Sequence, residues 1–130
     1  MFLVATDTNM YSKNTILIVD DEEMIKRMLK DVLKNAFEVL DASNGRDALE
    51  ILAANVDKVA VIVLDLMMPV MDGFQFMDAF RKNRLYDNIP VIIATSDEDW
   101  HAEQKCLEAG VWDFVMKPYD PVLLRFRIKN

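Results

Sequence analysis

The sequence predicts an α/β fold in which five parallel strands form one doubly wound sheet with helices on both of its faces. Two observations lead to this prediction. Short apolar runs rich in β-branched residues recur along the chain, and stretches with helical periodicity separate them. The clearest run, Val59–Leu64, contains no polar residue, which is typical of a parallel strand covered on both faces. Strands that alternate with helices in this way form parallel sheets.

The first strand is predicted at residues 15–19, an apolar and mostly β-branched run. A helix follows, because apolar residues recur three and four positions apart after Glu23. Its predicted buried face consists of Met24, Ile25, Met28, Leu29, Val32 and Leu33. Its predicted solvent face consists of Lys26, Arg27, Lys30 and Lys34.

The second strand is predicted at Phe37–Leu40. Asn44 is suited to cap the next helix, because its side chain can accept a hydrogen bond from a first-turn N–H. The predicted buried face of that helix consists of Ala48, Leu49, Ile51 and Leu52. After the third strand, Asp72 and Gly73 open a third helix. The residues of that helix predicted to point inward are Phe74, Met77 and Phe80.

The second half of the chain continues the alternation. Pro90 begins a fourth strand at residues 90–94, where a leading proline is tolerated because its missing N–H is not needed. A fourth helix is predicted from about residue 99 to residue 109, and a fifth strand at residues 112–116. Asp120 and Pro121 then open a fifth helix as its N-cap and its first helical residue.

Composition indicates one soluble globular domain and excludes several classes of partner. The chain has 130 residues, a formal net charge of −7 and one cysteine, Cys106. Such a chain lacks the basic surface that nonspecific nucleic-acid binding or anionic-membrane binding requires. No apolar run reaches the length of a membrane span, and one cysteine permits no internal disulfide. We therefore expect a cytoplasmic protein in a reducing compartment.

Polar residues follow four of the predicted strands. They are Asp20 and Asp21 after the first strand, Asp65 after the third, Thr95 after the fourth and Lys117 after the fifth. Right-handed crossovers bring these strand ends to one edge of a parallel sheet, where open α/β sheets bind ligands. Each residue alone also has a plainer interpretation, as a turn residue, a helix cap or a solvated charge. The coincidence of all five favours a functional site.

The three aspartates predict specific chemistry at that edge. Two unit charges about 4 Å apart repel by roughly 4 kcal/mol at an effective dielectric constant near 20, so the cluster requires protonation, a cation or Lys117. Oxygen ligands without histidine or cysteine favour Mg²⁺, for which Mn²⁺ could substitute. A carboxylate can also act as a nucleophile towards phosphorus, and a lysine with a divalent cation can neutralise the transferring group. The edge therefore predicts phosphoryl chemistry.

Four segments of the chain resemble the receiver domain of two-component response regulators, and of chemotaxis regulators in particular. The segments are Ile18–Glu22, Leu64–Gly73, Pro90–Ser96 and Phe114–Pro118. They occur in the family's order and spacing from about residue 13 to the end of the chain. The resemblance implies a flavodoxin-like fold with strand order 2-1-3-4-5. It also implies a receiver domain at residues 14–130, which leaves residues 1–13 as an N-terminal tail or extension.

The resemblance implies a role for each residue of the predicted site. Asp65 would accept a phosphoryl group from the phosphohistidine of a sensor histidine kinase or a phosphotransfer protein, in bacterial-type signalling. Asp21, Asp65 and the backbone carbonyl of Met67 would ligate Mg²⁺, with Asp20 reaching the ion mainly through water. Thr95 and Lys117 would bind the phosphoryl oxygens. By this resemblance the chain is a signalling domain that assists its own phosphorylation and dephosphorylation, and not an enzyme.

The resemblance also places Phe114 at the family's switch position. Its ring would turn inward behind Thr95 and change the surface formed by residues 99–109, the fifth strand and the fifth helix. That surface is expected to contact an output domain, a partner protein or a second copy of the chain in a homodimer. The alternative for Phe114 is a permanently buried core ring, which is common for aromatic residues in strands.

Three further expectations accompany the resemblance. Met67 and Asp97, which flank the phosphoryl site, are hypothesised to tune the lifetime of the phosphoaspartate. The peptide bond between Lys117 and Pro118 is expected to be cis. The last helix ends in an apolar pattern that a longer helix would continue, so an output domain is expected to follow it.

Three other functions fit parts of the sequence. A haloacid-dehalogenase-like phosphatase also uses an aspartate nucleophile and Mg²⁺, but it needs a second aspartate where this chain has Met67, and it usually needs a cap domain. A flavodoxin-like FMN domain is disfavoured because the acidic loop after Val19 would repel a phosphate. A pseudo-receiver that interacts without phosphorylation is disfavoured by the complete set of Asp20, Asp21, Asp65, Thr95 and Lys117.

Overall fold

The computed structural model describes residues 13–95, 108, 113–117 and 120–129 of the chain. These residues form one five-stranded sheet in the order β2-β1-β3-β4-β5, and every neighbouring pair of strands is parallel. The strands are β1 (Thr15–Val19), β2 (Glu38–Ala42), β3 (Val59–Leu64), β4 (Val91–Thr95) and β5 (Asp113–Met116). The predicted fold class and strand order are confirmed.

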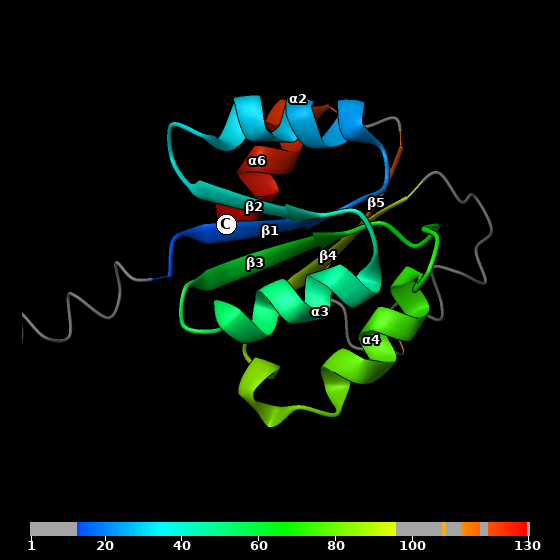
Figure 1. Cartoon of the computed structure of the whole chain (residues 1–130). Helices are drawn as coiled ribbons and strands as arrows, with labels where there is room; N and C mark the ends of the chain where they lie inside the picture. The colour runs from blue at the N-terminus through cyan, green and yellow to red at the C-terminus, as the bar shows by residue number, and fades with distance from the viewer. Residues whose placement is uncertain (1–12, 96–107, 109–112, 118–119, 130) are drawn as a thin grey trace, which may run out of the picture.

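Helices cover both faces of this sheet (Figure 1). They are α2 (Glu23–Leu33), α3 (Gly45–Ala54), α4 (Gly73–Arg81) and α6 (Pro121–Lys129), with a short 3₁₀-helix, η1 (Arg84–Tyr86). Figure 1 shows α2 and α6 together on one face and α3 and α4 on the other. The helix predicted at residues 99–109 lies, apart from residue 108, outside the described ranges, as does nearly all of the predicted N-terminal tail.

Two hydrophobic clusters explain why the strands contain uninterrupted apolar runs. Ile16 and Ile18 of β1 face the α2 and α6 side and pack with Leu29 and Leu124. Leu17 and Val19 face the opposite side and belong to the cluster that includes residues of α3 and α4. Because successive side chains of a strand point to opposite faces, each face of the sheet requires its own apolar residues. Within the described ranges, no helix combines the length and apolar character needed to cross a membrane.

Strand β2 begins one residue later than predicted and ends two residues later. Its pairing with β1 continues through Asp41 and Ala42, which lie opposite Ile18 and Val19. The sequence pattern stopped at Leu40 because Asp41 is charged. In the folded chain, Asp41 forms an ion pair with Lys30 of α2, which offsets the cost of placing a carboxylate in the strand.

The buried face of α2 differs from the prediction. Met24 and Met28 are exposed, whereas Lys26 is only 3% exposed. The Lys26 ammonium donates a hydrogen bond to Ser43 Oγ at 2.6 Å and lies 2.8 Å from a carboxylate oxygen of Glu23. The prediction that Lys26 faces solvent and that the two methionines are buried is therefore wrong. A lysine is accommodated inside because its aliphatic stem packs while its charged end is paired.

Helix α4 begins where the sequence predicts and is positioned tightly against β3. Asp72 and Gln75 form a capping box at its start. A Cβ atom at Gly73 would lie 2.6 Å from the backbone oxygen of Asp65, so only glycine permits this close approach. Among the phenylalanines of α4, Phe74, which was predicted to point inward, is only partly buried. Phe76, which was not predicted to be buried, is fully buried.

Candidate functional site

The candidate site lies at the carboxyl edge of the sheet, where β1 and β3 end side by side. The backbone N–H of Asp20 donates to the carbonyl of Ala42 at 3.0 Å, and that of Asp65 donates to the carbonyl of Val19 at 2.8 Å. These bonds continue the strand pairing by one residue and fix the two aspartates next to each other. Asp20 is 3% exposed and Asp65 is 4% exposed, so both carboxyl groups are largely removed from water.

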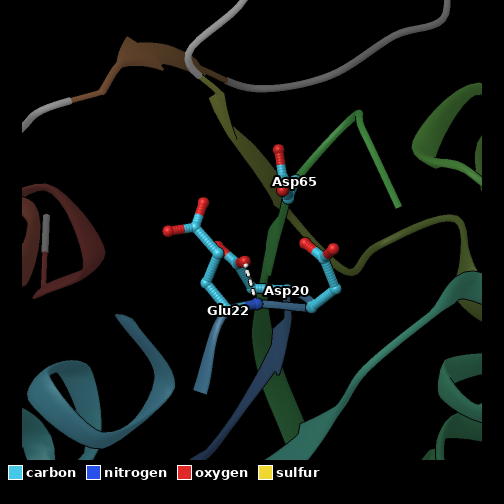
Figure 2. Close-up of side chains that lie close together, drawn as sticks. Asp20, Glu22 and Asp65 are labelled. Carbon is cyan, nitrogen blue, oxygen red and sulfur yellow. Dashed lines mark hydrogen bonds between the residues drawn. The ribbon is translucent and has the colours of Figure 1, made fainter. Parts of the chain in front are cut away.

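Four acidic residues gather at this edge. Asp20, Asp21, Glu22 and Asp65 each place a carboxylate oxygen within 4.8 Å of the others. Figure 2 shows Asp20 and Glu22 beside Asp65, although they come from different strand ends. The backbone N–H of Glu22 donates to Asp20 Oδ1 at 2.9 Å and thereby orients that carboxylate. Asp21 and Glu22 are exposed, so the cluster has a buried half and a solvent-facing half.

Lys117, which directly follows β5, supplies the opposite charge. Its Nζ atom lies 2.7 Å from Asp20 Oδ2, 3.3 Å from Glu22 Oε1 and 3.5 Å from Asp65 Oδ2. The Lys117 side chain is buried, as are those of Asp20 and Asp65. One ammonium therefore connects the ends of the three strands β1, β3 and β5 through their charged side chains.

The electrostatic balance of the site appears in two shifted pKa values. Burial raises the pKa of the Asp65 carboxyl above 3.8, and the charge of Asp20 adds to this rise, although Lys117 and the Met67 N–H oppose it. Burial by itself lowers the pKa of Lys117, but the hydrogen bond and charge of Asp20, with the charges of Asp65 and Glu22, raise it well above its usual range. Lys117 is therefore a permanent cation, and the site retains an excess of carboxylates that favours a cation or another electrophile.

The loop between β3 and α4 borders Asp65. The Met67 N–H donates to Asp65 Oδ1 at 3.4 Å, and the Met67 side chain is exposed. Val70 has φ of 66°, and the Met71 N–H donates to the Pro69 carbonyl at 2.7 Å across it. This is a tight γ-turn, a conformation that costs energy for a β-branched residue. The Met71 carbonyl in turn accepts from the Gly45 N–H at 2.8 Å, which connects the loop to α3.

The structure brings together the predicted residues Asp20, Asp21, Asp65 and Lys117. Thr95 is the last residue of β4 and pairs with Met116, so its backbone lies at the same edge of the sheet. Asp97 and Pro118 lie outside the described residues.

Phe114, the predicted switch residue, lies in β5. It is partly buried and packs against the cluster on the α3 and α4 side.

The donor set fits a hard divalent cation. The gathered ligand atoms are all carboxylate oxygens, and no histidine or cysteine joins them within the described part of the chain. Mg²⁺ and Mn²⁺ prefer such ligands and are commonly held by one or two carboxylates together with phosphate oxygens and water. The exposed half of the cluster leaves room for such additional ligands.

Sequence reasoning missed one residue of the site, Glu22. Acidic residues are common near the start of a helix, where the positive end of the helix dipole favours them, so Glu22 does not stand out in the sequence. Its position directly after Asp20 and Asp21 was the available signal. Its contact with Lys117 depends on a partner 95 residues away, which local sequence patterns do not reveal.

Comparisons with known proteins agree with this geometry. The chain matches the response regulator receiver domain family over residues 16–129. The transcriptional regulatory protein SrrA of Staphylococcus aureus (strain NCTC 8325 / PS 47) is 38% identical over 117 residues, which cover 89% of this chain and 46% of SrrA. The chain therefore spans about half the length of the curated relatives that it matches.

Two solved structures are also similar. Chemotaxis protein CheY4 of Vibrio cholerae superposes with a TM-score of 0.80 at 31% identity, covering 90% of this chain and 98% of CheY4. The BeF3-activated receiver domain of DrrB superposes with a TM-score of 0.79 at 29% identity, covering 90% of this chain and 95% of that one. The strand order, the carboxylates gathered around a lysine and a family match over nearly the whole chain lead to one conclusion: the chain belongs to the response regulator receiver domain family.

Proposed function

We propose that this chain is a phosphoacceptor domain in which Asp65 receives a phosphoryl group from a phosphohistidine of a sensor histidine kinase or a phosphotransfer protein. The P–N bond of the phosphohistidine breaks as a carboxylate oxygen of Asp65 bonds to phosphorus, and the imidazole nitrogen keeps the electron pair. The observation that carries this proposal is the buried Asp65 carboxylate, with the Lys117 ammonium 3.5 Å away and further carboxylates beside it.

The residues around Asp65 have complementary roles in this proposal. Asp21, Asp65 and the backbone carbonyl of Met67 would hold Mg²⁺ or Mn²⁺, with Asp20 reaching it through water. Once bound, the ion supplies positive charge beside the phosphoryl oxygens. Lys117 donates to one of these oxygens, and its charge compensates the negative charge that the group brings. The Thr95 hydroxyl donates to another.

The proposed output of phosphorylation is a change at β5. When Thr95 engages the phosphoryl group, Phe114 turns further inward behind it, and the surface made by residues 99–109, β5 and α6 changes. This surface contacts an output domain, a partner protein or a second copy of the chain. SrrA is named as a transcriptional regulatory protein, and it is about twice as long as this chain. Both facts support an output domain that controls transcription.

The remaining assignments follow from the same proposal. The domain acts in the cytoplasm as a signalling switch that assists its own phosphorylation and dephosphorylation, not as an enzyme with a separate substrate. Met67 and Asp97 tune the lifetime of the phosphoaspartate. The similarity to a receiver domain described as BeF3-activated supports competence for phosphorylation, because BeF₃⁻ is a phosphoryl mimic.

The experiment that tests the proposal is intact-mass measurement after incubation with a small phosphoryl donor such as acetyl phosphate. The samples are the wild type, Asp65→Asn and the control Asp31→Asn, each with and without Mg²⁺; Asp31 is an exposed residue of α2. One added phosphoryl group is expected in the wild type and in Asp31→Asn, only with Mg²⁺, and none in Asp65→Asn. An adduct that persists in Asp65→Asn would contradict the role of Asp65. No adduct in any sample would favour the pseudo-receiver alternative.

A further inference from the structure

Helix α2 begins after Glu22, and the side chain of Glu22 does not cap it. Glu22 occupies the N-cap position in an extended conformation, yet it makes no side-chain hydrogen bond to the first turn. Asn44, Asp72 and Asp120 do accept such bonds from the first turns of α3, α4 and α6. An N-cap bond usually stabilises a helix by about 1 kcal/mol. The start of α2 thus lacks a local stabilisation that the starts of these three helices have.

The carboxylate of Glu22 contacts Lys117 instead. Glu22 Oε1 accepts a hydrogen bond from Lys117 Nζ at 3.3 Å. Figure 2 shows the Glu22 carboxylate directed away from the α2 ribbon, at the edge where Asp20 and Asp65 lie. An ammonium has three N–H donors. Asp20, Glu22 and Asp65 are the three carboxylates that surround it among the described residues.

A phosphoryl group on Asp65 would disturb this arrangement. Lys117 can donate to a phosphoryl oxygen only if it weakens its contact with one of the three carboxylates. The Glu22 side chain is 56% exposed, whereas those of Asp20 and Asp65 are each 5% exposed. Of the three carboxylates, Glu22 can lose its contact with Lys117 at the lowest cost, because water already solvates it, whereas the other two would be left buried without a counterion. The negative charge of the phosphoryl group would also repel Glu22.

We propose that Glu22 is a positioning residue that holds Lys117 among the carboxylates before phosphorylation and competes with the phosphoryl group for the lysine ammonium. This inference rests on the proposed function of Asp65 and Lys117. Glu22 thereby limits how tightly the site holds a phosphoryl group. Removal of its charge, without a change in its size, strengthens that binding.

The test uses the full chain in saturating Mg²⁺. BeF₃⁻, which mimics a phosphoryl group on a carboxylate, is titrated into the chain, and calorimetry measures its Kd. The variant is Glu22→Gln and the matched control is Glu23→Gln. Both variants lose one negative charge in adjacent positions, but Glu23 pairs with Lys26 at 2.8 Å and not with Lys117. The Kd for BeF₃⁻ is expected to fall about three- to tenfold in Glu22→Gln and to stay within about twofold in Glu23→Gln.

A second measurement follows Lys117 directly in the unliganded chain. The ¹H–¹⁵N signal of its ammonium group reports hydrogen exchange with water, which hydrogen bonds slow. Exchange is expected to be several-fold faster in Glu22→Gln than in the wild type, and unchanged in Glu23→Gln. A purely structural role of Glu22 in α2 would not produce this difference, and the measurement does not depend on phosphorylation.

The outcomes separate this inference from the proposed function. If the wild type binds BeF₃⁻ and both glutamine variants bind it equally tightly, the effect is one of general charge and the role of Glu22 is wrong. Weaker binding by Glu22→Gln, or unchanged exchange at Lys117, also overturns it. If the wild type does not bind BeF₃⁻ at all, the proposed function fails and this inference fails with it.

Discussion

The Lys117 ammonium lies 2.7 Å from Oδ2 of Asp20, although 97 residues separate the two in the sequence. This contact joins the end of β5 to the end of β1, two strands that are not neighbours in the sheet. Both side chains are buried, and Asp65, which directly follows β3, one of the two strands between them, lies 3.5 Å from the same ammonium. The ion pairs of Lys117 therefore have a structural effect as well as a proposed role in phosphoryl binding.

Replacement of Lys117 by methionine is expected to lower the free energy of unfolding by about 2–3 kcal/mol at neutral pH without divalent cations. The substitution leaves the buried carboxylates of Asp20 and Asp65 without their counterion, and breaking a buried pair is costly. Urea denaturation in EDTA measures the change. Lys34→Met is the control, because Lys34 is an exposed lysine paired only with Asp31 among the described residues. Equal stability of the two variants would show that the Lys117 ion pairs do not stabilise the fold.

Asp65 is expected to destabilise the fold at neutral pH. Because burial raises its pKa above 3.8, the folded chain binds more protons at Asp65 than the unfolded chain between 3.8 and the raised value. The free energy of unfolding therefore falls as the pH rises through that window. In EDTA at pH 7, Asp65→Asn should therefore be more stable than the wild type. This advantage should shrink as the pH falls and vanish well below pH 3.8, where Asp65 is protonated in both states.

Mg²⁺ provides the matching control for this prediction. A cation that binds only the folded wild type increases its stability by mass action. The advantage of Asp65→Asn at pH 7 should therefore shrink as Mg²⁺ is added. The exposed residue Asp57 supplies a control substitution, Asp57→Asn, which should show neither the pH dependence nor the response to Mg²⁺. An Asp65→Asn variant less stable than the wild type in EDTA would contradict the argument.

The sequence predicted the strands, and which polar residues lie at their carboxyl ends, because both depend on local patterns. An uninterrupted apolar run such as Val59–Leu64 specifies a strand buried on both faces, and a polar residue directly after it specifies what lies at the sheet edge. The sequence did not predict the burial of Lys26. Helical periodicity assigns this lysine to the solvent face. In the structure it is buried, and Ser43, in the loop between β2 and α3, offers it an acceptor at 2.6 Å. The Glu22 contact with Lys117 was missed for the same reason.

The pairing of Lys26 leads to a stability prediction of its own. Lys26→Ala is expected to lower the free energy of unfolding by about 1–3 kcal/mol, because it leaves Ser43 Oγ without its donor and removes a packed aliphatic stem. Lys34→Ala, at an exposed lysine directly after the same helix, should change the free energy of unfolding by less than about 1 kcal/mol. Thermal or urea denaturation measures both values. Similar small effects in both variants would mean that the Lys26 contacts contribute little.

Replacement of Val70 by glycine is expected to stabilise the chain. Its φ of 66° is costly for a β-branched residue and acceptable for glycine, and its side chain is 71% exposed, so little burial is lost on removal. Val70→Gly is expected to raise the free energy of unfolding by about 0.5–1 kcal/mol. The same substitution at Val122, in the first turn of α6, should instead destabilise the chain. A destabilised Val70→Gly variant would show that the surrounding hydrogen bonds do not hold the turn under strain.

The lifetime of the phosphoaspartate is expected to depend on Met67 and Asp97. The exposed Met67 side chain is close in sequence to Asp65, so Met67→Ala should admit water and speed the loss of the phosphoryl group. Asp97→Ala removes a negative charge that is expected to orient the attacking water, so this variant should lose the phosphoryl group more slowly. Changes of about two- to tenfold correspond to barrier changes of up to about 1.4 kcal/mol, a plausible size for residues that do not react themselves. Intact-mass measurements over time give the dephosphorylation rates of both variants.

Met24→Ala is the control, because Met24 is an exposed methionine of α2. Rates equal to that of the control in both variants would remove Met67 and Asp97 from the mechanism, and would leave the lifetime to residues that contact Asp65 directly.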